Sequence, residues 1–423
     1  MERLAVKGGR PVRDRPFPAC VTIGEEEKRA VLGVLESTVL SRFLAVWGPD
    51  YLGGPQVRAL EAEWASRFGA RHAVSVNSAT SGLYAAVGAA GVGPGDEVIV
   101  SPFTMTASAT AALIYGGIPV FADIDPETFC ISPDTIAARL TPRTRAVIAV
   151  DLFGHPADMD GIMDLARDHD LTVIEDAAQA PGASLNGKPA GTLAHLGVFS
   201  LNYHKTIHCG EGGMVVTDDP ALAERVQMIR NHAEVAVKAR GVKDLVNMVG
   251  WNYRMTEIEA AIAREQLKKL DRLVAARQEA AAYLTGRLEG TRGLLPPRVR
   301  PGVKHGYYLY AMRYTGAGSG IPREKVVAAL VAEGIPVVNG YVEPIYLQPL
   351  YQQRIAFGRD GFPFTYPGYT GTVDYRKGIC PVTERMYYDE LMYTGVCHAQ
   401  VTREDLDDVA GGFQKVFGAL EEL

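Results

Sequence analysis

Between residues 72 and 219, apolar runs of strand length alternate with stretches in which apolar side chains recur at helical spacing. The apolar runs are continuous, as in EVIVS at 97–101 and TVIE at 172–175. Continuous apolar strands are typical of a parallel sheet that is covered by helices on both faces. The pattern therefore predicts an α/β domain with a doubly wound sheet of about seven strands. The predicted strands are 72–76, 97–101, 118–122, 146–151, 171–175, 197–201 and 213–217, and the helices beside them include 80–90, 106–115 and 158–168.

Helical spacing also flanks this region. Residues 25–35 and 57–68 each predict a helix, and the loop between them, 41–55, is rich in glycine and aromatic residues. After the last strand, 220–233 predicts another helix. Residues 255–288 predict a long helix because Ala, Glu, Leu and Lys, which favour helices, are frequent there. Its length indicates a connector between two domains.

A stretch rich in proline and glycine, 290–301, marks the predicted domain boundary. We therefore expect a large domain over residues 1–290, which includes an N-terminal arm and the connector helix. A smaller α+β domain is expected over 291–423. Its predicted elements are a strand at 307–314, a helix at 322–334, a long loop at 340–378 rich in Tyr, Pro and Gly, and a closing helix at 402–420.

The composition is that of an ordinary globular protein. Hydrophobic residues make up 47% and charged residues 22% of the 423 positions. Lys and Arg together number 43 against 49 Asp and Glu, which gives a formal net charge of −6. Dedicated nucleic-acid binders usually carry a basic surplus, so the balance argues against a nucleic-acid partner and leaves room only for a local basic pocket.

The cysteine pattern and the hydropathy give the expected location. The five cysteines are odd in number and none lie at metal-ligand spacing, so neither a disulfide framework nor a metal site is predicted. No run of 18 uncharged apolar residues occurs, and the N-terminal segment has no apolar core of signal-peptide length. We therefore expect a cytoplasmic protein without a membrane partner.

The first candidate for chemistry is NSATSG at 77–82, which follows a predicted strand and opens a predicted helix. Small residues let backbone N–H groups and hydroxyls approach an anion, and the N-terminus of a helix favours negative charge. The segment indicates a phosphate site. The alternative is an ordinary N-cap, in which Ser or Thr satisfies free amides.

Two charged residues follow later strands. Asp176 ends the buried run LTVIED, where a carboxylate is costly unless a cation, a metal or a protonated ring nitrogen meets it. Its alternative role is again an N-cap. Lys205 lies in FSLNYHKT with no acidic residue within five positions, and a lysine among neutral groups becomes a usable nucleophile. A solvent-facing lysine is the alternative.

Two further segments follow the lysine along the chain. GEGG at 210–213 implies a tight chain path with the backbone packed near a ligand. GWNYRMTE at 250–257 leads into the long helix, where Asn252 or Thr256 could serve as a cap. Its aromatic, amide and basic side chains also suit a site shared between subunits.

The order of these features favours one cofactor. A phosphate anchor comes first, a carboxylate follows 97 residues after Ala79, and a lysine follows Asp176 by 29 residues. A pyridoxal phosphate enzyme of the aspartate-aminotransferase fold needs this order. Such an enzyme needs a phosphate cradle, an Asp that keeps the pyridine nitrogen protonated, and a Lys that forms the Schiff base and then moves protons.

Five ordered segments resemble the DegT/DnrJ/StrS family of pyridoxal phosphate-dependent sugar aminotransferases, nearly end to end. They are GVGPGDEVIVSPFTMTASATAALIYGGIPVFADID, TPRTRAVIAVDLFGHPADMD with IEDAAQAPGA, FSLNYHKTIHCGEGGMVVTDD, WNYRMTEIEAAIAREQL and CPVTERM. The resemblance implies the fold type I architecture of aspartate aminotransferase, with a large domain of about seven mostly parallel strands and a smaller α+β domain.

The resemblance also implies roles for individual residues. Lys205 matches the Schiff-base lysine and Asp176 the pyridinium partner, and these two are the expected catalytic residues. The remaining matches are Ala79 and Thr80 in the phosphate-binding turn, Ser200 at the phosphate, Gln179 facing the phenolic oxygen of the coenzyme, and Asn252, which reaches the phosphate in the neighbouring subunit. The last match implies a homodimer with shared sites.

Two positions depart from the family pattern. Met105 stands where the family often has an aromatic side chain stacked on the pyridine ring, and a thioether can also cover a ring face. His204 precedes the lysine, and some relatives have histidine in place of the lysine itself and perform dehydration or deoxygenation. Here Lys205 keeps the lysine position, which favours transamination.

The sequence thus predicts an aminotransferase that moves an amino group from L-glutamate or L-glutamine to a keto-sugar, a sugar nucleotide or a keto-cyclitol. Two alternatives share the fold, namely a pyridoxal phosphate-dependent sugar dehydratase and a non-catalytic regulator. A nicotinamide-dependent enzyme is disfavoured because no G-x-G-x-x-G follows the first strand.

Overall fold

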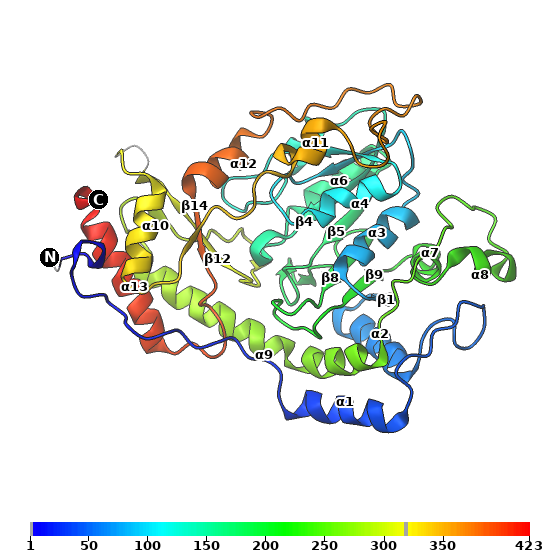
Figure 1. Cartoon of the computed structure of the whole chain (residues 1–423), viewed down its shortest axis with the longest axis horizontal. Coiled ribbons are helices and arrows are strands. Elements are labelled where there is room, and N and C mark those ends of the chain that lie inside the picture. Colours follow the sequence, from blue (N-terminus) through cyan, green and yellow to red (C-terminus); the bar gives the residue numbers. More distant parts are fainter. Residues whose placement is uncertain (1–2, 317–319) are drawn as a thin grey trace.

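The computed structural model describes residues 3–316 and 320–423. Residues 1–2 of the predicted arm and 317–319 of the predicted second domain lie outside the described part. Figure 1 shows a larger body built on one sheet and a smaller body beside which both chain ends lie. The long helix α9 (Glu257–Leu288) runs along both bodies.

Seven strands form the large sheet, in the order β1-β9-β8-β5-β4-β2-β3. Strands β8, β5, β4, β2 and β3 pair in parallel, whereas β9 is antiparallel to both of its neighbours. The predicted α/β class with a mostly parallel sheet is therefore confirmed. The strands are β1 His72–Val76, β2 Glu97–Val100, β3 Ile118–Phe121, β4 Thr144–Val150, β5 Thr172–Asp176, β8 Leu196–Ser200 and β9 Gly213–Thr217.

The continuous apolar strands are explained by burial on both faces of this sheet. Val98 and Val100 pack in one cluster with helices that cover the first face, and Ile99 between them packs in another cluster on the opposite face. Successive side chains of a strand point to opposite faces, so both sets must be apolar. The first face carries α3 (Ala79–Ala89), α4 (Ala107–Ile114) and α7 (Pro220–Arg230), and the second carries α2 (Pro55–Phe68), α6 (Met159–Asp168) and α9.

The smaller body has its own core. Its sheet has the order β10-β12-β14-β13 and packs against α10 (Arg323–Ala332) and α13 (Arg403–Gly418). Leu4 of the N-terminal arm and Leu284 of α9 are buried in the same cluster. The strands are β10 Leu294–Leu295, β12 Tyr310–Tyr314, β13 Val338–Asn339 and β14 Leu391–Thr394.

The chain also returns from the smaller body to the larger one. Residues 345–385, orange in Figure 1, lie along the β3 edge of the large sheet and include η4 (Ile345–Leu347), α11 (Pro349–Gln353) and α12 (Pro381–Arg385). Tyr346 and Tyr375 from this segment are buried in the core of the large body. The division near residue 290 stays a prediction, and segments cross it in both directions.

Several local elements differ from the sequence expectation. The predicted helix 220–233 ends at Arg230, because the Asn231 side chain bonds to the carbonyls of Leu44 and Tyr51 and His232 adopts a positive φ of 54°. A new helix, α8 (Ala233–Arg240), follows.

The remaining elements are η1 Ala5–Lys7, α1 Glu25–Ser37, α5 Pro133–Ala137, η2 Leu152–Gly154, the π-turn Met386–Glu390, η6 Leu420–Glu422 and a small sheet of β6 Ser184–Leu185, β7 Lys188–Pro189 and β11 Val303–Lys304.

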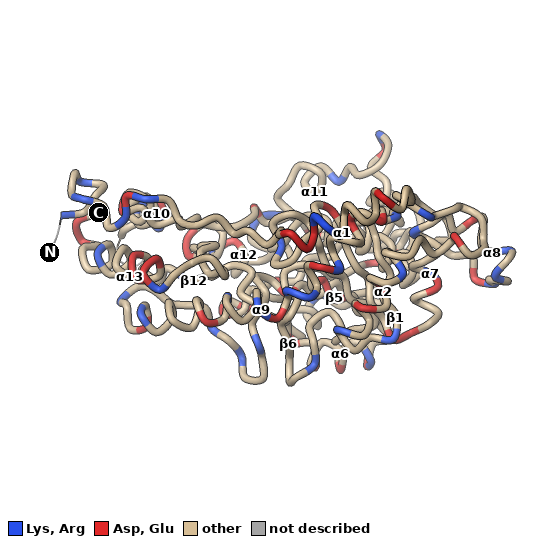
Figure 2. The backbone as a smooth tube through the Cα atoms, turned by 90° about the horizontal axis from the view of Figure 1, so that it is seen from below, with Lys and Arg blue, Asp and Glu red and all other residues tan. Residues whose placement is uncertain are grey.

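The surface mixes both signs of charge. Figure 2 shows Lys and Arg interspersed with Asp and Glu along the whole length of the molecule. In the part of the chain that the structure describes, none of the helices combines the length and the apolar character that crossing a bilayer requires.

Candidate active site

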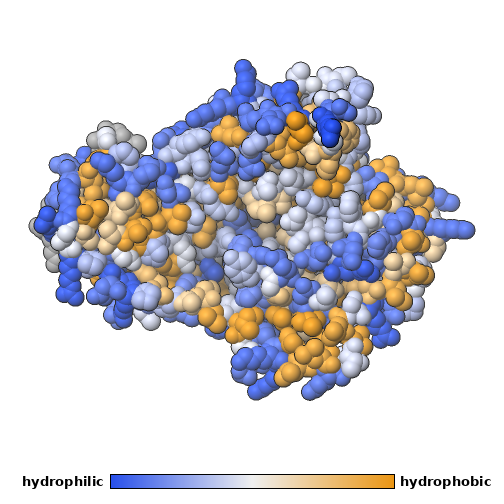
Figure 3. Space-filling view, viewed as in Figure 1, coloured by the Kyte–Doolittle hydropathy of each residue, from blue (hydrophilic) through white to orange (hydrophobic). Residues whose placement is uncertain are grey.

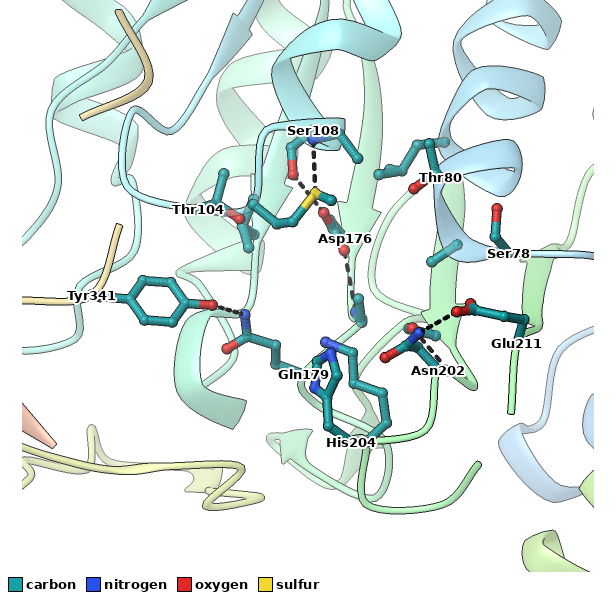
Figure 4. Close-up of a pocket in the computed structure, with 18 residues that line it drawn as sticks. Ser78, Thr80, Thr104, Ser108, Asp176, Gln179, Asn202, His204, Glu211 and Tyr341 are labelled. Atoms are coloured by element: carbon teal, nitrogen blue, oxygen red, sulfur yellow. Dashed lines mark hydrogen bonds between the residues drawn. The ribbon is translucent and has the colours of Figure 1, made fainter. Parts of the chain in front are cut away.

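A cavity of about 220 Å³ opens at the carboxyl ends of the parallel strands, where open α/β sheets place their ligands (Figure 4). Seven of the eight predicted site residues line it: Ala79, Thr80, Met105, Asp176, Gln179, Ser200 and Lys205. These residues come from segments more than 120 positions apart in the chain, and the fold brings them to one place.

The N-terminus of α3 forms one wall of the cavity. The Ser78 side chain caps the helix by accepting from the N–H of Ser81 at 3.1 Å, which leaves the N–H groups of Ala79 and Thr80 without an acceptor within the helix. The backbone of Gly213 passes directly against this turn, since a Cβ there would lie 2.7 Å from the Ala79 nitrogen. Small residues, free N–H groups and hydroxyls therefore meet at this wall, which suits a phosphate.

Asp176 is held at the end of β5 with a side chain only slightly accessible to solvent. Its Oδ2 accepts a hydrogen bond of 2.7 Å from the Ser108 hydroxyl, and its Oδ1 accepts from the Ala178 N–H at 3.2 Å. Burial raises the pKa of Asp176, while the bonds from Ser108 and Ala178 and the charge of Lys205 act in the opposite direction. The carboxylate is thus fixed in a desolvated position, where a positively charged ring nitrogen would be a favourable partner.

Two more carboxyl groups are buried close to Asp176. Glu175 accepts backbone N–H bonds from Gly191 and Leu193 at 2.7 and 2.8 Å, and Asp151 accepts from Ala157 at 2.9 Å. Burial raises the pKa of Asp151 well above its usual value, and the charge of Glu175 raises it further. Burial and the neighbouring charge thus favour the protonated form of Asp151.

Lys205 follows β8 in a tight turn, in which its N–H donates to the carbonyl of Asn202 at 2.9 Å. Burial lowers the pKa of Lys205 to about 8, and the charge of Asp176 partly opposes this effect. A substantial fraction of the side chain is therefore a neutral amine near pH 7.5, the form in which an amine is a nucleophile.

The amide of Gln179 is oriented by two bonds. Its Oε1 accepts from the Phe153 N–H at 2.8 Å. Its Nε2 donates to the Tyr341 hydroxyl at 2.9 Å, as Figure 4 shows. Tyr341 opens the predicted loop 340–378, so the second half of the chain completes the cavity. Burial raises the pKa of Tyr341 to about 12, which keeps its hydroxyl protonated.

Several lining residues were not singled out from the sequence, although each lies in a segment described there. Ser108 is the hydrogen-bond donor to Asp176, and Tyr341 bonds to Gln179. Asn202 donates to Glu211 at 2.7 Å, and both line the cavity. No local pattern marks these residues, because their partners are distant in the sequence or become neighbours only in the fold.

Two predicted residues have less enclosed positions. Met105 lines the cavity but is 56% exposed, and its sulfur accepts from the Ala107 N–H at 3.0 Å. Asn252 is exposed and is not among the lining residues of this cavity; its Oδ1 accepts from Arg254 at 2.7 Å. In the single chain, Asn252 therefore takes no part in the cavity formed by the other seven.

The donor set fits pyridoxal phosphate, the coenzyme that the sequence resemblance implies. The α3 turn and Ser200 suit the phosphate, the buried carboxylate of Asp176 suits the ring nitrogen, and Lys205 offers an amine to the aldehyde. One buried atom also points to a missing polar partner, since Asn202 Oδ1 has no hydrogen bond within the described residues.

Comparison with known proteins agrees with this chemistry. The model of the DegT/DnrJ/EryC1/StrS aminotransferase family matches residues 25–366. The L-glutamine:2-deoxy-scyllo-inosose aminotransferase of Streptomyces fradiae is 37% identical, over 98% of this chain and 97% of its own. The GDP-perosamine synthase of Caulobacter vibrioides is 38% identical over 69% of this chain and 77% of its own. The X-ray structure of an aminotransferase from Psychrobacter cryohalolentis superposes with a TM-score of 0.82 at 29% identity, covering 96% of this chain and all of that one.

Proposed function

The chain belongs to the DegT/DnrJ/EryC1/StrS aminotransferase family, and on that premise we propose that it transfers the amino group of L-glutamine or L-glutamate to a ketone of a cyclitol or a sugar. The observation that carries the proposal is the meeting of Lys205, Asp176 and the α3 turn in one cavity. The Streptomyces relative, which matches over nearly the whole of both chains, makes a keto-cyclitol the first acceptor to test.

The residues of the cavity would have different roles. Pyridoxal phosphate, when bound, supplies an electron-withdrawing ring and a carbonyl group that takes up the amine. The N–H groups at the start of α3 and the Ser200 hydroxyl would bind the phosphate, and Asp176 would keep the ring nitrogen protonated. Gln179, held from both sides, would fix the ring plane by contact with its phenolic oxygen.

Lys205 would perform the proton transfer. Its lowered pKa of about 8 lets the same amine accept a proton and release it near neutral pH. Because Lys205 lines the cavity, a bound substrate would displace solvent around Nζ, and the proton would pass between Nζ and the substrate. This role requires the lysine to be free of the coenzyme for part of each cycle.

The test is turnover with defined acceptors. The full-length protein would be incubated with L-glutamine or L-glutamate and a panel of keto-cyclitols, free keto-sugars and nucleotide-linked keto-sugars, and the amino products would be identified by mass spectrometry. We expect an amino-cyclitol or amino-sugar that Lys205→Ala does not form and that Lys188→Ala, altered at an exposed lysine outside the cavity, still forms. A Lys205→Ala variant that transaminates at the wild-type rate would refute the proposal.

We further propose a homodimer in which Asn252 serves the site of the neighbouring subunit. Figure 3 shows apolar side chains gathered over α1 and in the region of α8, and large exposed apolar patches mark interaction surfaces. Exposed apolar residues also surround Asn252 in the chain: Val235, Leu245, Val246, Val249 and Trp251. A second copy of the chain would cover these residues and bring Asn252 to a cavity that lacks it.

Mixing two inactive variants tests the shared site. In a mixed dimer of Lys205→Ala and Asn252→Ala chains, one site would carry both changes and the other would carry neither. Co-expression with two affinity tags would allow the mixed dimer to be isolated, and we expect about half of the wild-type activity per dimer. Activity no higher than the mean of the two parent variants would contradict the shared site.

A cytoplasmic location is also part of the proposal. All five cysteines, Cys20, Cys130, Cys209, Cys380 and Cys397, are free thiols in the structure. Free thiols are stable in a reducing compartment, which supports this location.

A further inference from the structure

The ring of Tyr308 lies against the reactive lysine. Lys205 Nζ stands 4.8 Å from the centroid of the Tyr308 ring, within the range of a cation–π contact. In the described part of the chain, Nζ forms no hydrogen bond or ion pair, so the ring face is its direct neighbour. Tyr308 precedes β12, more than 100 residues after the lysine.

The orientation of that ring is fixed at both ends. The Tyr308 hydroxyl lies 2.6 Å from Nδ1 of His204, the residue next to the lysine. At the backbone, the guanidinium of the buried Arg277 donates to the carbonyls of Tyr307 and Tyr308 at 3.2 and 3.3 Å. Gly154 permits the close approach of this segment, since a Cβ there would lie 3.0 Å from the Tyr308 nitrogen.

The groups around Lys205 act on its charge in different directions. Asp176 favours the ammonium, burial disfavours it, and His204 disfavours it whenever the imidazole is protonated. Across the cavity, Glu211 and Tyr341 are the other titratable groups that line it. The face of an aromatic ring attracts a cation without accepting a proton, so Tyr308 favours the ammonium and leaves the amine lone pair free once the proton is lost.

We propose that Tyr308 is a positioning residue that holds the free Lys205 amine over its ring face, ready to exchange a proton, and that His204 and Arg277 keep the ring in place. The proposal rests on the proposed role of Lys205 as the reactive amine. When the lysine is not attached to the coenzyme, the ring prevents it from folding away and stabilises its protonated state.

The test measures the protonation of Lys205 directly and needs no catalysis. The full-length protein would be freed of bound carbonyl compounds with hydroxylamine and dialysed. It would then be labelled with traces of acetic anhydride between pH 6 and 11. Mass spectrometry of the Lys205 peptide gives the pH midpoint of its reactivity, and the exposed Lys188 provides an internal standard in every sample.

Three changes at position 308 separate the ring face from other effects. Tyr308→Phe keeps the face and removes the bond to His204. Pentafluorophenylalanine at position 308 keeps the ring shape and reverses the charge distribution over its face. Tyr308→Leu removes the ring. The matched control is Tyr203→Leu. The Tyr203 ring is also a neighbour of His204, with 5.1 Å between the ring centroids, but it is largely exposed.

We expect the Lys205 midpoint to remain within about 0.3 pH unit of the wild type in the control, and also in Tyr308→Phe, where Arg277 still holds the backbone of residues 307 and 308. With the fluorinated ring it should fall by about half a pH unit or more, which corresponds to about threefold greater reactivity at neutral pH. Tyr308→Leu should lower it in the same direction. Equal midpoints for the phenyl and fluorinated rings would overturn the proposal, as would a higher midpoint in Tyr308→Leu with the fluorinated ring unchanged.

Failure of this proposal is distinguishable from failure of the proposed function. A protein that shows the fluorination shift but binds no pyridoxal phosphate would retain the Tyr308 contact and lose the proposed function. A protein that transaminates but shows no shift would retain its function, and Tyr308 would be only a wall of the cavity.

Discussion

Ser108 offers a way to change the charge of Asp176 without touching the carboxyl group itself. Its hydroxyl donates to Asp176 Oδ2 at 2.7 Å, and both side chains are almost fully buried. Ser108→Ala removes this donor and leaves the Ala178 N–H as the neighbouring donor to the carboxylate. Because the bond is strongest when Asp176 is ionised, its loss must favour the protonated acid.

The size of the effect follows from the difference between two hydrogen bonds. A bond to an ionised group contributes about 1.5–3 kcal/mol and a bond to a neutral group about 1 kcal/mol. The difference is about 0.5–2 kcal/mol, which is centred near the value of about 1.4 kcal/mol that corresponds to one pKa unit. Burial already raises the pKa of Asp176, so Ser108→Ala should raise it further by about one unit.

The assay is the binding of pyridoxamine phosphate between pH 5 and 9, because this form of the coenzyme cannot attach to Lys205 covalently. An ionised Asp176 pairs with the protonated ring nitrogen, whereas a protonated Asp176 does not. The acid limb of the affinity profile should therefore move up by about one pH unit in Ser108→Ala, with about tenfold weaker binding within that interval. Thr110→Ala, a hydroxyl removed from the same helix but outside the cavity, should leave the profile unchanged.

Two results would refute this reasoning. An acid limb that stays in place would mean that Asp176 does not govern the binding of the ring. Binding that is weakened equally at every pH would mean that Ser108 acts on the shape of the cavity and not on the charge of Asp176.

Three further changes have defined outcomes. Gly213→Ala would bring a Cβ to 2.7 Å from the Ala79 nitrogen and should displace the α3 turn. We expect the free energy of unfolding to fall by about 1–3 kcal/mol and coenzyme binding to weaken in a fluorescence titration. The control is Gly286→Ala, whose added Cβ meets nothing within 4 Å and should change neither stability nor binding in this way. Asp151→Asn removes a titrating group. Because the pKa of Asp151 is raised in the folded protein, the wild type loses stability as pH rises above 3.8, by up to about 1.4 kcal/mol per pH unit until the folded pKa is reached. Thermal unfolding of the variant should therefore depend less on pH, and identical pH profiles of the two proteins would contradict the raised pKa of Asp151. Tyr341→Phe leaves the Gln179 Nε2 without its acceptor, and we expect a several-fold lower kcat in steady-state assays; an unchanged kcat would show that this bond does not orient the amide.

The predictable part of the site consists of residues that carry a local signal. Asp176 directly follows a buried strand, Lys205 follows the next one, and the small residues of the α3 turn open a helix, so their order along the chain could be read. Ser108 gave no such signal, because its partner Asp176 lies 68 residues away and a serine in an apolar helix has many possible roles. Tyr308 was inside a predicted strand, and only the fold shows that it meets Lys205.

The fold followed the same rule. The large sheet was predictable because both of its faces are buried, which makes strands such as β2 continuously apolar. Strand β14 and the two-residue strand β13 were not predicted, because they are short and form by pairing with partners that are distant in the sequence. The return of residues 345–385 to the large body is a tertiary contact of aromatic side chains, and periodicity does not encode it.

The most direct test of the central claim is the visible absorption spectrum of the full-length protein with pyridoxal phosphate, recorded before and after L-glutamine or L-glutamate is added. The account predicts a band of the protein-bound coenzyme that is replaced by the absorption of pyridoxamine phosphate with one or both donors, and no such band in Lys205→Ala. A band that ignores both donors would contradict the proposed transamination, and the absence of any band in the wild type would show that Lys205 does not hold the coenzyme.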